Sequence, residues 1–201
     1  MADITLALVL KSETNWPWQF VLAVKHNVSA QTINCLCSGL HAKEMDSLIE
    51  YLRACASLAS NELLVPVSLL SLTCQELSQA VDKMQEDLWH IQRDTGLHGA
   101  CINHDPRDLS VLNLNNIIRQ LTALSDHCTR SISRTETLKR LLIPLEAILQ
   151  RQERRNSDGC RIIRDHLQLI EQTISGSQHY VNWYLSSANG QVQTVYKPLT
   201  C

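Results

Sequence analysis

A heptad repeat between residues 109 and 151 constrains this chain more than any other feature. Apolar or small residues return every seven positions in two sets, which are Leu114, Leu121, Cys128, Thr135, Leu142 and Leu149, and Ile117, Leu124, Ser131, Leu138 and Leu145. Alternating steps of three and four keep both sets on one stripe of an α-helix, and the strict period favours a left-handed supercoil with a neighbouring helix. The pattern predicts a helix roughly 65 Å long over about 109–151, which needs partner helices to cover its stripe.

Two further stretches, about 62–94 and about 157–196, supply those partners. Each carries an apolar or small residue every three or four positions. In the first stretch these are Cys74, Leu77, Val81, Met84, Leu88 and Ile91, and in the second they are Cys160, Ile163, Leu167, Ile170, Ile174, Ser177, Val181 and Tyr184. The spacing predicts two more long helices, joined to the central one by short connections, and hence an antiparallel three-helix bundle or coiled coil.

Local signals set the ends of these helices. Ser60 or Asn61 can cap the helix over 62–94, and Pro66 is tolerated only in its first turn. Pro144 has no N–H to bond back four residues, so we expect a kink near the end of the central helix.

The first 60 residues have a different pattern. Short β-branched and aromatic runs at about 4–10, 18–26 and 31–37 predict strands, at least two of them in a hairpin, and residues 42–58 have helical spacing. The predicted fold class is therefore mainly α (α+β). A small α/β N-terminal portion over 1–60 precedes the long-helix bundle over 61–197, and both belong to one continuous domain.

Charge and hydropathy exclude several classes of protein. The formal net charge of −2 shows no basic excess, so nucleic-acid binding is not expected. The apolar run Leu63–Leu72 contains Pro66 and is about half the ~20 residues that a membrane helix needs. We therefore expect a cytoplasmic chain that does not insert into a membrane. Of eight cysteines, Cys74, Cys128 and Cys160 fall on predicted helix stripes, where reduced thiols act as small apolar groups.

One loop contains a group of metal-ligating residue types. His98, Cys101 and His104 are spaced by three, and Asp105 follows. Imidazole and thiolate bind zinc, but a structural zinc site takes four ligands at paired spacings that this loop lacks, so an ordinary solvated loop is favoured. Cys35 and Cys37 would lie on one side of a strand, where packing is the simpler role. No nucleophile motif or phosphate loop is present, and we expect no enzyme activity.

Five arginines surround the connection between the last two helices. They could bind an acidic partner or lipid headgroups, but cations near a helix C-terminus are also common because they interact favourably with the helix dipole. The second reading is favoured for this group, which is Arg151, Arg154, Arg155, Arg161 and Arg164.

Two passages resemble a known family. Leu63–Pro66 opens a long helix that closes near Gly96–Gly99, and Gly190–Tyr196 reads Gly-Gln-Val-Gln-Thr-Val-Tyr near the end of the last helix. Both are similar to the soluble region of fungal CorA-like magnesium-transporter proteins, over about residues 16–197. That family's transport depends on two C-terminal membrane helices and a Gly-Met-Asn signature, and this sequence contains neither.

The resemblance implies a non-catalytic cytosolic domain that ends before the pore and cannot transport ions itself. It implies a possible association with Mg²⁺, although no ion-binding residue can be carried over and the residues themselves predict no cofactor. Expected partners are a second copy or full-length CorA-like relatives, through helix packing. The chain would be membrane-associated if its natural product continued into membrane helices. The alternative is a stand-alone cytosolic helical-bundle interaction module unrelated to ion transport.

Overall fold

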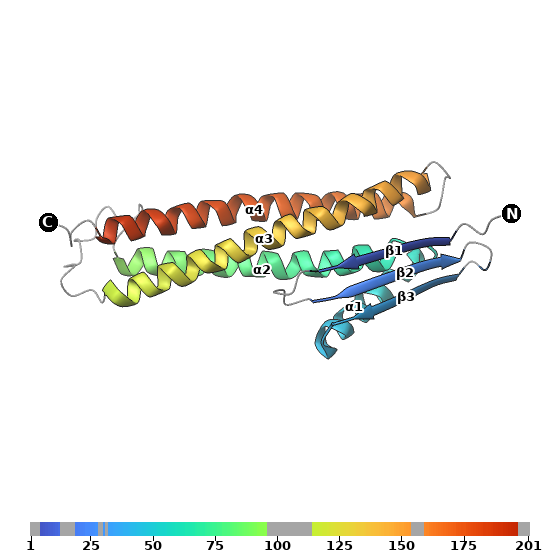
Figure 1. Ribbon diagram of the computed structural model, residues 1–201, viewed down its shortest axis with the longest axis horizontal. Coiled ribbons are helices and arrows are strands. Elements are labelled where there is room, and N and C mark those ends of the chain that lie inside the picture. The colour runs from blue at the N-terminus through green and yellow to red at the C-terminus, as the bar shows by residue number, and fades with distance from the viewer. Residues whose placement is uncertain are drawn as a thin grey trace. The chain divides into compact units, whose positions relative to one another are not determined.

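The computed structural model describes residues 5–12, 19–27, 30, 32–95, 114–153 and 159–196. Three strands, β1 (Thr5–Lys11), β2 (Val21–Asn27) and β3 (Thr32–Ser38), precede the helices α1 (Ala42–Ala54), the 3₁₀ turn η1 (Ala56–Leu58), α2 (Leu64–Thr95), α3 (Leu114–Glu153) and α4 (Cys160–Tyr196) (Figure 1). Two compact units form: unit 1 comprises Met1–Glu76 and Glu136–Ile174, and unit 2 comprises Leu77–Thr135 and Ser175–Cys201. Each is described separately.

Unit 1 contains an antiparallel sheet with the strand order β1-β2-β3 (Figure 1). Leu8 pairs with Val24 and Leu10 pairs with Leu22, so these side chains share one face, and all four are buried. Alternate residues point to the other face, where Val9 is 67% exposed. This alternation between a buried and an exposed face is typical of an antiparallel sheet covered on one side.

The chain turns sharply where β3 ends. Gly39 has φ +98°, and a Cβ added there would lie 2.5 Å from the Gln19 carbonyl oxygen. Because L side chains rarely adopt this conformation and no space exists for one, only glycine fits the turn without strain.

The start of α2 follows its sequence signals. The Asn61 side-chain oxygen accepts a hydrogen bond from the Leu63 N–H at 2.9 Å, in the turn before α2 begins at Leu64, and the capping predicted for Ser60 or Asn61 stays a prediction. Pro66 is the third residue of α2 and therefore lies in its first turn, as predicted. In α3 the helix continues past Pro144 to Glu153, and the expected kink stays a prediction.

The helical core of unit 1 comes from the start of α2, the end of α3 and the start of α4. Its fully buried side chains include Leu63, Leu69, Leu138, Leu145 and Ile163. The end of α3 lies beside the start of α2, because Gln152 donates a hydrogen bond to Glu62 at 2.9 Å. The two helices therefore run antiparallel in this unit.

Unit 2 consists of the second half of α2, the first half of α3 and the second half of α4. Cys128 lies 3.9 Å from Met84, measured between the two sulfur atoms, and Tyr184 hydrogen-bonds Gln85, so all three helices contribute to one core. Its buried side chains also include Leu77, Val81, Leu88, Ile91, Ile117, Leu121, Leu124, Val181 and Ala188.

The predicted fold class, mainly helical with a small N-terminal sheet, is confirmed. Every residue of the three predicted apolar stripes is buried except Leu114, which is half-buried. The helix predicted over 42–58 is split into α1 and the 3₁₀ turn, and the strand predicted over 18–26 begins at Val21. The division at residue 60 within one continuous domain stays a prediction. Among the residues that the structure describes, no helix has the length and apolar character needed to cross a membrane.

Candidate functional site: an aromatic groove in unit 2

An open groove with a volume of ≈ 930 Å³ lies between α2 and α4 in unit 2. Its α2 wall is centred on Asp82, Glu86 and Trp89, which recur every three or four positions and so share one side of the helix. From α4 the groove is lined by Trp183 and Tyr184. The α2 residues are Asp82, Gln85, Glu86, Leu88, Trp89, His90 and Gln92.

Large aromatic side chains concentrate at this groove. Trp89 on α2 is 44% exposed and Trp183 on α4 is 54% exposed, although indole is normally among the more buried side chains. Trp183 packs edge-on against Tyr184, with ring centroids 5.2 Å apart. Tyr180, one turn earlier on α4, stacks on Tyr184 at 6.4 Å and is 55% exposed. The groove therefore presents a nearly continuous aromatic surface to solvent.

Tyr184 anchors this surface to the core. Its ring is buried, and its hydroxyl donates to the Gln85 side-chain oxygen at 3.4 Å. Burial raises the pKa of the Tyr184 hydroxyl, with smaller contributions from Tyr180 and the Asp82 carboxylate. The Asp82 charge therefore lies close enough to the aromatic cluster to affect it. Because its pKa is raised, the Tyr184 hydroxyl stays protonated, and can donate a hydrogen bond, to a higher pH than an ordinary tyrosine.

The charged groups of the groove are mostly negative. Asp82 and Glu86 are among the lining residues, whereas Lys and Arg are not. The Arg93 guanidinium lies over the Trp89 ring, 4.9 Å from its centroid, and 3.6 Å from the Asp94 carboxylate. A cation over an indole face is a favourable electrostatic contact, so the chain already uses one of its tryptophans in this way.

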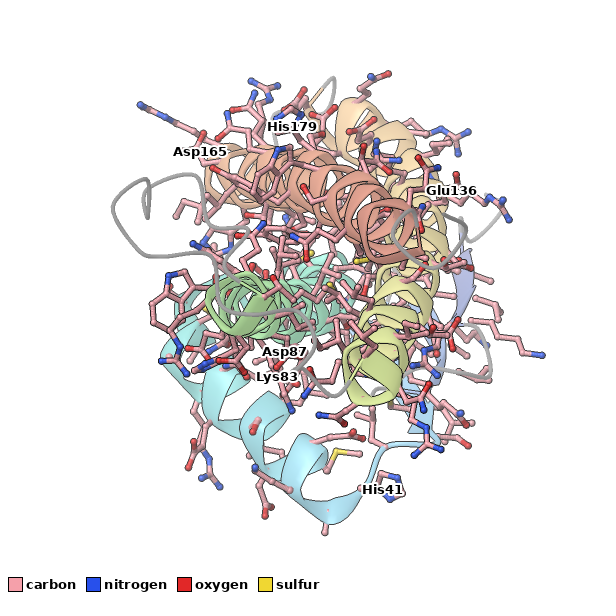
Figure 2. The ribbon with its side chains drawn as sticks, turned by 90° about the vertical axis from the view of Figure 1, so that its left-hand side faces the viewer. His41, Lys83, Asp87, Glu136, Asp165 and His179 are labelled. Carbon is pink, nitrogen blue, oxygen red and sulfur yellow. The ribbon has the colours of Figure 1, made fainter. Side chains whose placement is uncertain are left out.

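A smaller cavity of ≈ 200 Å³ lies between α2 and α3 in the same unit. Its lining includes Asp87 and Ile91 from α2 and Leu124 and His127 from α3. Figure 2 shows Lys83 and Asp87 on the side of α2 that faces away from α4, and His179 on the side of α4 that faces away from α2. These three residues therefore belong to other surfaces than the aromatic groove.

Unit 1 holds a polar network of its own. His26 on β2 forms a hydrogen-bonded ion pair through its Nδ1 with one oxygen of Glu62, and Gln152 on α3 donates to the other oxygen at 2.9 Å. The Gln152 oxygen accepts a hydrogen bond from Asn61 at 3.4 Å and contacts the Cys160 sulfur at 3.8 Å. The Glu62 side chain is only 10% exposed, so these partners compensate for burying a carboxylate. The network joins the sheet to the ends of three helices.

Comparison with protein-family models gave no match. No curated protein matches the chain either. The resemblance to CorA-like proteins therefore stays a prediction that depends on the two sequence passages.

The loop with His98, Cys101, His104 and Asp105 lies outside the described residues. Elsewhere in the described part of the chain, no group of three or more His, Cys, Asp or Glu side chains could hold a metal ion.

The two cysteines of β3 share one side of the strand, as predicted. They pair in register with Val24 and Leu22 of β2, but Cys35 is exposed and Cys37 is half-buried, so the predicted packing role stays a prediction. Partial burial raises the pKa of both thiols, and the neighbouring Cys37 raises the pKa of Cys35 further.

Of the five arginines, Arg154 and Arg155 lie outside the described residues. Arg164 forms an ion pair with Glu153 across the α3–α4 connection, so its charge is balanced within unit 1. The helix-dipole interpretation of the whole group stays a prediction.

The aromatic groove was missed at the sequence level. Trp89 and Trp183 are next to Leu88 and Tyr184 in the sequence but do not belong to the predicted apolar stripes. The available signal was the pair of large aromatics at positions that the helical period places towards solvent.

Proposed function

We propose that this chain is a non-catalytic helical interaction module, and that the groove of unit 2 docks an α-helix of a partner protein. The observation that carries the proposal is the exposure of Trp89 and Trp183 on two neighbouring helices around one groove. Exposed aromatic clusters with a polar rim are typical of protein-binding surfaces, and tryptophan is strongly enriched among the residues that dominate binding energy.

The dimensions of the groove favour a helix as the occupant. Its α2 wall runs from Asp82 to Gln92, which is about 15 Å at ~1.5 Å per residue. A partner helix presents side chains at i, i+3 or i+4, and i+7 over the same length, so three anchors can enter such a groove. An open groove of ≈ 930 Å³ also suits a set of side chains better than an enclosed small molecule.

The second candidate is a CorA-like cytosolic domain without its pore. Its support is the position of the two passages: Leu63–Pro66 stands at the start of the 32-residue helix α2, and Gly190–Tyr196 forms the last turns of α4. In this reading the partners are a second copy or a longer relative, and the chain is cytoplasmic. Sequencing the gene beyond Cys201 tests it, because an in-frame continuation with two apolar segments and Gly-Met-Asn is expected.

The interaction module is tested by selecting helices that bind. A displayed library of 16-residue amphipathic helices, unbiased in charge, is selected against the full chain, and the enriched peptides are measured by fluorescence anisotropy. We expect Trp183→Ala to weaken binding about thirtyfold, the effect of losing a hot-spot residue worth ~2 kcal/mol.

The matched control is Leu169→Ala. Leu169 is also on α4 and is 62% exposed, but it belongs to unit 1 and does not line the groove. Its removal should leave the affinity unchanged. The proposal is wrong if no helix is enriched, or if the enriched helices bind the Trp183→Ala variant as tightly as the unaltered chain.

A further inference from the structure

We infer that the helix docked in the unit 2 groove is basic, with Lys or Arg residues four positions apart beside its apolar anchors. This inference rests on the proposed function, because it names the chemistry of the partner at the same groove. Three features of the groove support it: the placement of its carboxylates, the absence of Lys and Arg from its lining, and the exposure of its tryptophans.

The carboxylates of Asp82 and Glu86 stand four residues apart on α2. Side chains at this spacing are neighbours on one helix face, about 5–6 Å apart at their Cβ atoms. Two cations four residues apart on a partner helix have the same separation. An antiparallel or parallel partner helix can therefore place one cation beside each carboxylate without bending.

The described lining contains no Lys or Arg to offset these two charges, and its one histidine is His90 on α2. The α4 wall belongs to a stretch, Ser175–Gln193, that contains no Lys, Arg, Asp or Glu, and its single histidine, His179, lies on the side of α4 away from α2. Lys83 lies on the side of α2 that faces away from α4 (Figure 2). Arg93 stands over Trp89 but is itself close to Asp94. The groove therefore attracts cations and disfavours an acidic segment.

The aromatic rings of the groove also favour a cation. Such a contact already exists within the chain, where the Arg93 guanidinium lies 4.9 Å from the Trp89 ring centroid. Trp183, at 54% exposure, offers an indole surface to a cation brought in by a partner. A Lys or Arg side chain can pack its methylene stem along this ring while its charge reaches Glu86 or Asp82.

The experiment compares three 16-residue peptides with one helical framework and identical apolar anchors. They carry Lys, Gln or Glu at the same two positions, four residues apart, next to the anchors. Binding to the full chain is measured by anisotropy at low and at high ionic strength. We expect the Lys peptide to bind about three- to tenfold more tightly than the Gln peptide at low salt, the Glu peptide to bind most weakly, and the differences to shrink as salt is added.

Two variants locate the preference. Asp82→Asn combined with Glu86→Gln should abolish the difference between the Lys and Gln peptides. Asp87→Asn is the matched control, because Asp87 is a carboxylate on the same helix that lines the other cavity and not this groove. The control should retain the full preference for Lys.

The possible failures are distinct. Binding of all three peptides with equal affinity would overturn the basic-helix inference while the interaction module stands. Failure of every peptide and of the unbiased library to bind would overturn both. A chain that dimerises in sedimentation experiments, with the dimer lost in Trp183→Ala, would assign the groove to a second copy and also overturn the inference.

Discussion

Truncating Leu121 to alanine tests the helical core of unit 2 most directly. Leu121 is on the central stripe of α3 and is 0% exposed. Leu121→Ala removes three carbon atoms, worth about 2.4 kcal/mol at ~0.8 kcal/mol per buried methylene group. A cavity that the surrounding helices do not fill adds to this loss, and buried Leu→Ala changes reach ~5 kcal/mol. We therefore expect the free energy of unfolding to fall by about 2.4–5 kcal/mol.

The assay is urea unfolding followed by circular dichroism at the helical band. Leu169→Ala is the matched control, because it makes the same chemical change in a helix at a position that is 62% exposed. Its free energy of unfolding should change by less than ~0.5 kcal/mol, the range of ordinary surface substitutions.

A loss below ~0.5 kcal/mol for Leu121→Ala would refute the reasoning, since a fully enclosed leucine cannot be removed at the cost of a surface residue. Equal, large losses for both variants would also refute it. That result would mean that Leu169 is buried in solution, contrary to its exposure in the structure.

Four further outcomes are expected. Burial raises the pKa of the Cys74 thiol to about 12, so very little of it is thiolate at pH 8. After iodoacetamide treatment of the folded chain, mass spectrometry should find Cys74 unmodified and the exposed Cys35 alkylated. His26→Ala should lower the free energy of unfolding by about 1–3 kcal/mol in urea titrations, because the nearly buried Glu62 carboxylate loses a partner, and a neutral effect would contradict this. The purified chain should give no saturable magnesium flux across liposomes. It should form a weak, concentration-dependent oligomer by sedimentation velocity, with amide protection after about Ser186 only in the assembled form; a strict monomer protected in that region would argue against the CorA-like domain and favour the stand-alone interaction module.

The helical part of the fold could be predicted from sequence because its signal is local and repeated. Leu121 and Leu124 belong to a series of apolar residues spaced by three and four positions. This spacing identifies both the helix and the side of it that is buried. The same reasoning placed Pro66 in the first turn of α2, because the start of a helix depends on residues within one turn. Strand boundaries were less accurate, since pairing with a neighbour rather than local pattern decides where a strand begins.

The contacts that define the sites could not be predicted in the same way. His26 and Glu62 are separated by 36 residues, and Tyr184 and Gln85 by 99. Neither pair belongs to a motif, and their meeting depends on how strands and helices pack. Glu62 illustrates the difference: its sequence position suits the helix dipole, yet its carboxylate is held by β2 and α3.

The second half of α4 shows why the groove belongs to function rather than to folding. Tyr184 is 3% exposed and Trp183 is 54% exposed, although they are adjacent, because successive residues of a helix point about 100° apart. The core needs only the stripe that contains Val181, Tyr184 and Ala188. A helix that met water on its remaining surface would carry charged residues there, yet the stretch around Trp183 has none and instead exposes Tyr180 and Trp183. Packing within unit 2 does not require this second aromatic stripe, and the partner helix proposed above would account for its composition. The carboxylates of Asp82 and Glu86 on α2 are the reason for proposing that this helix is basic.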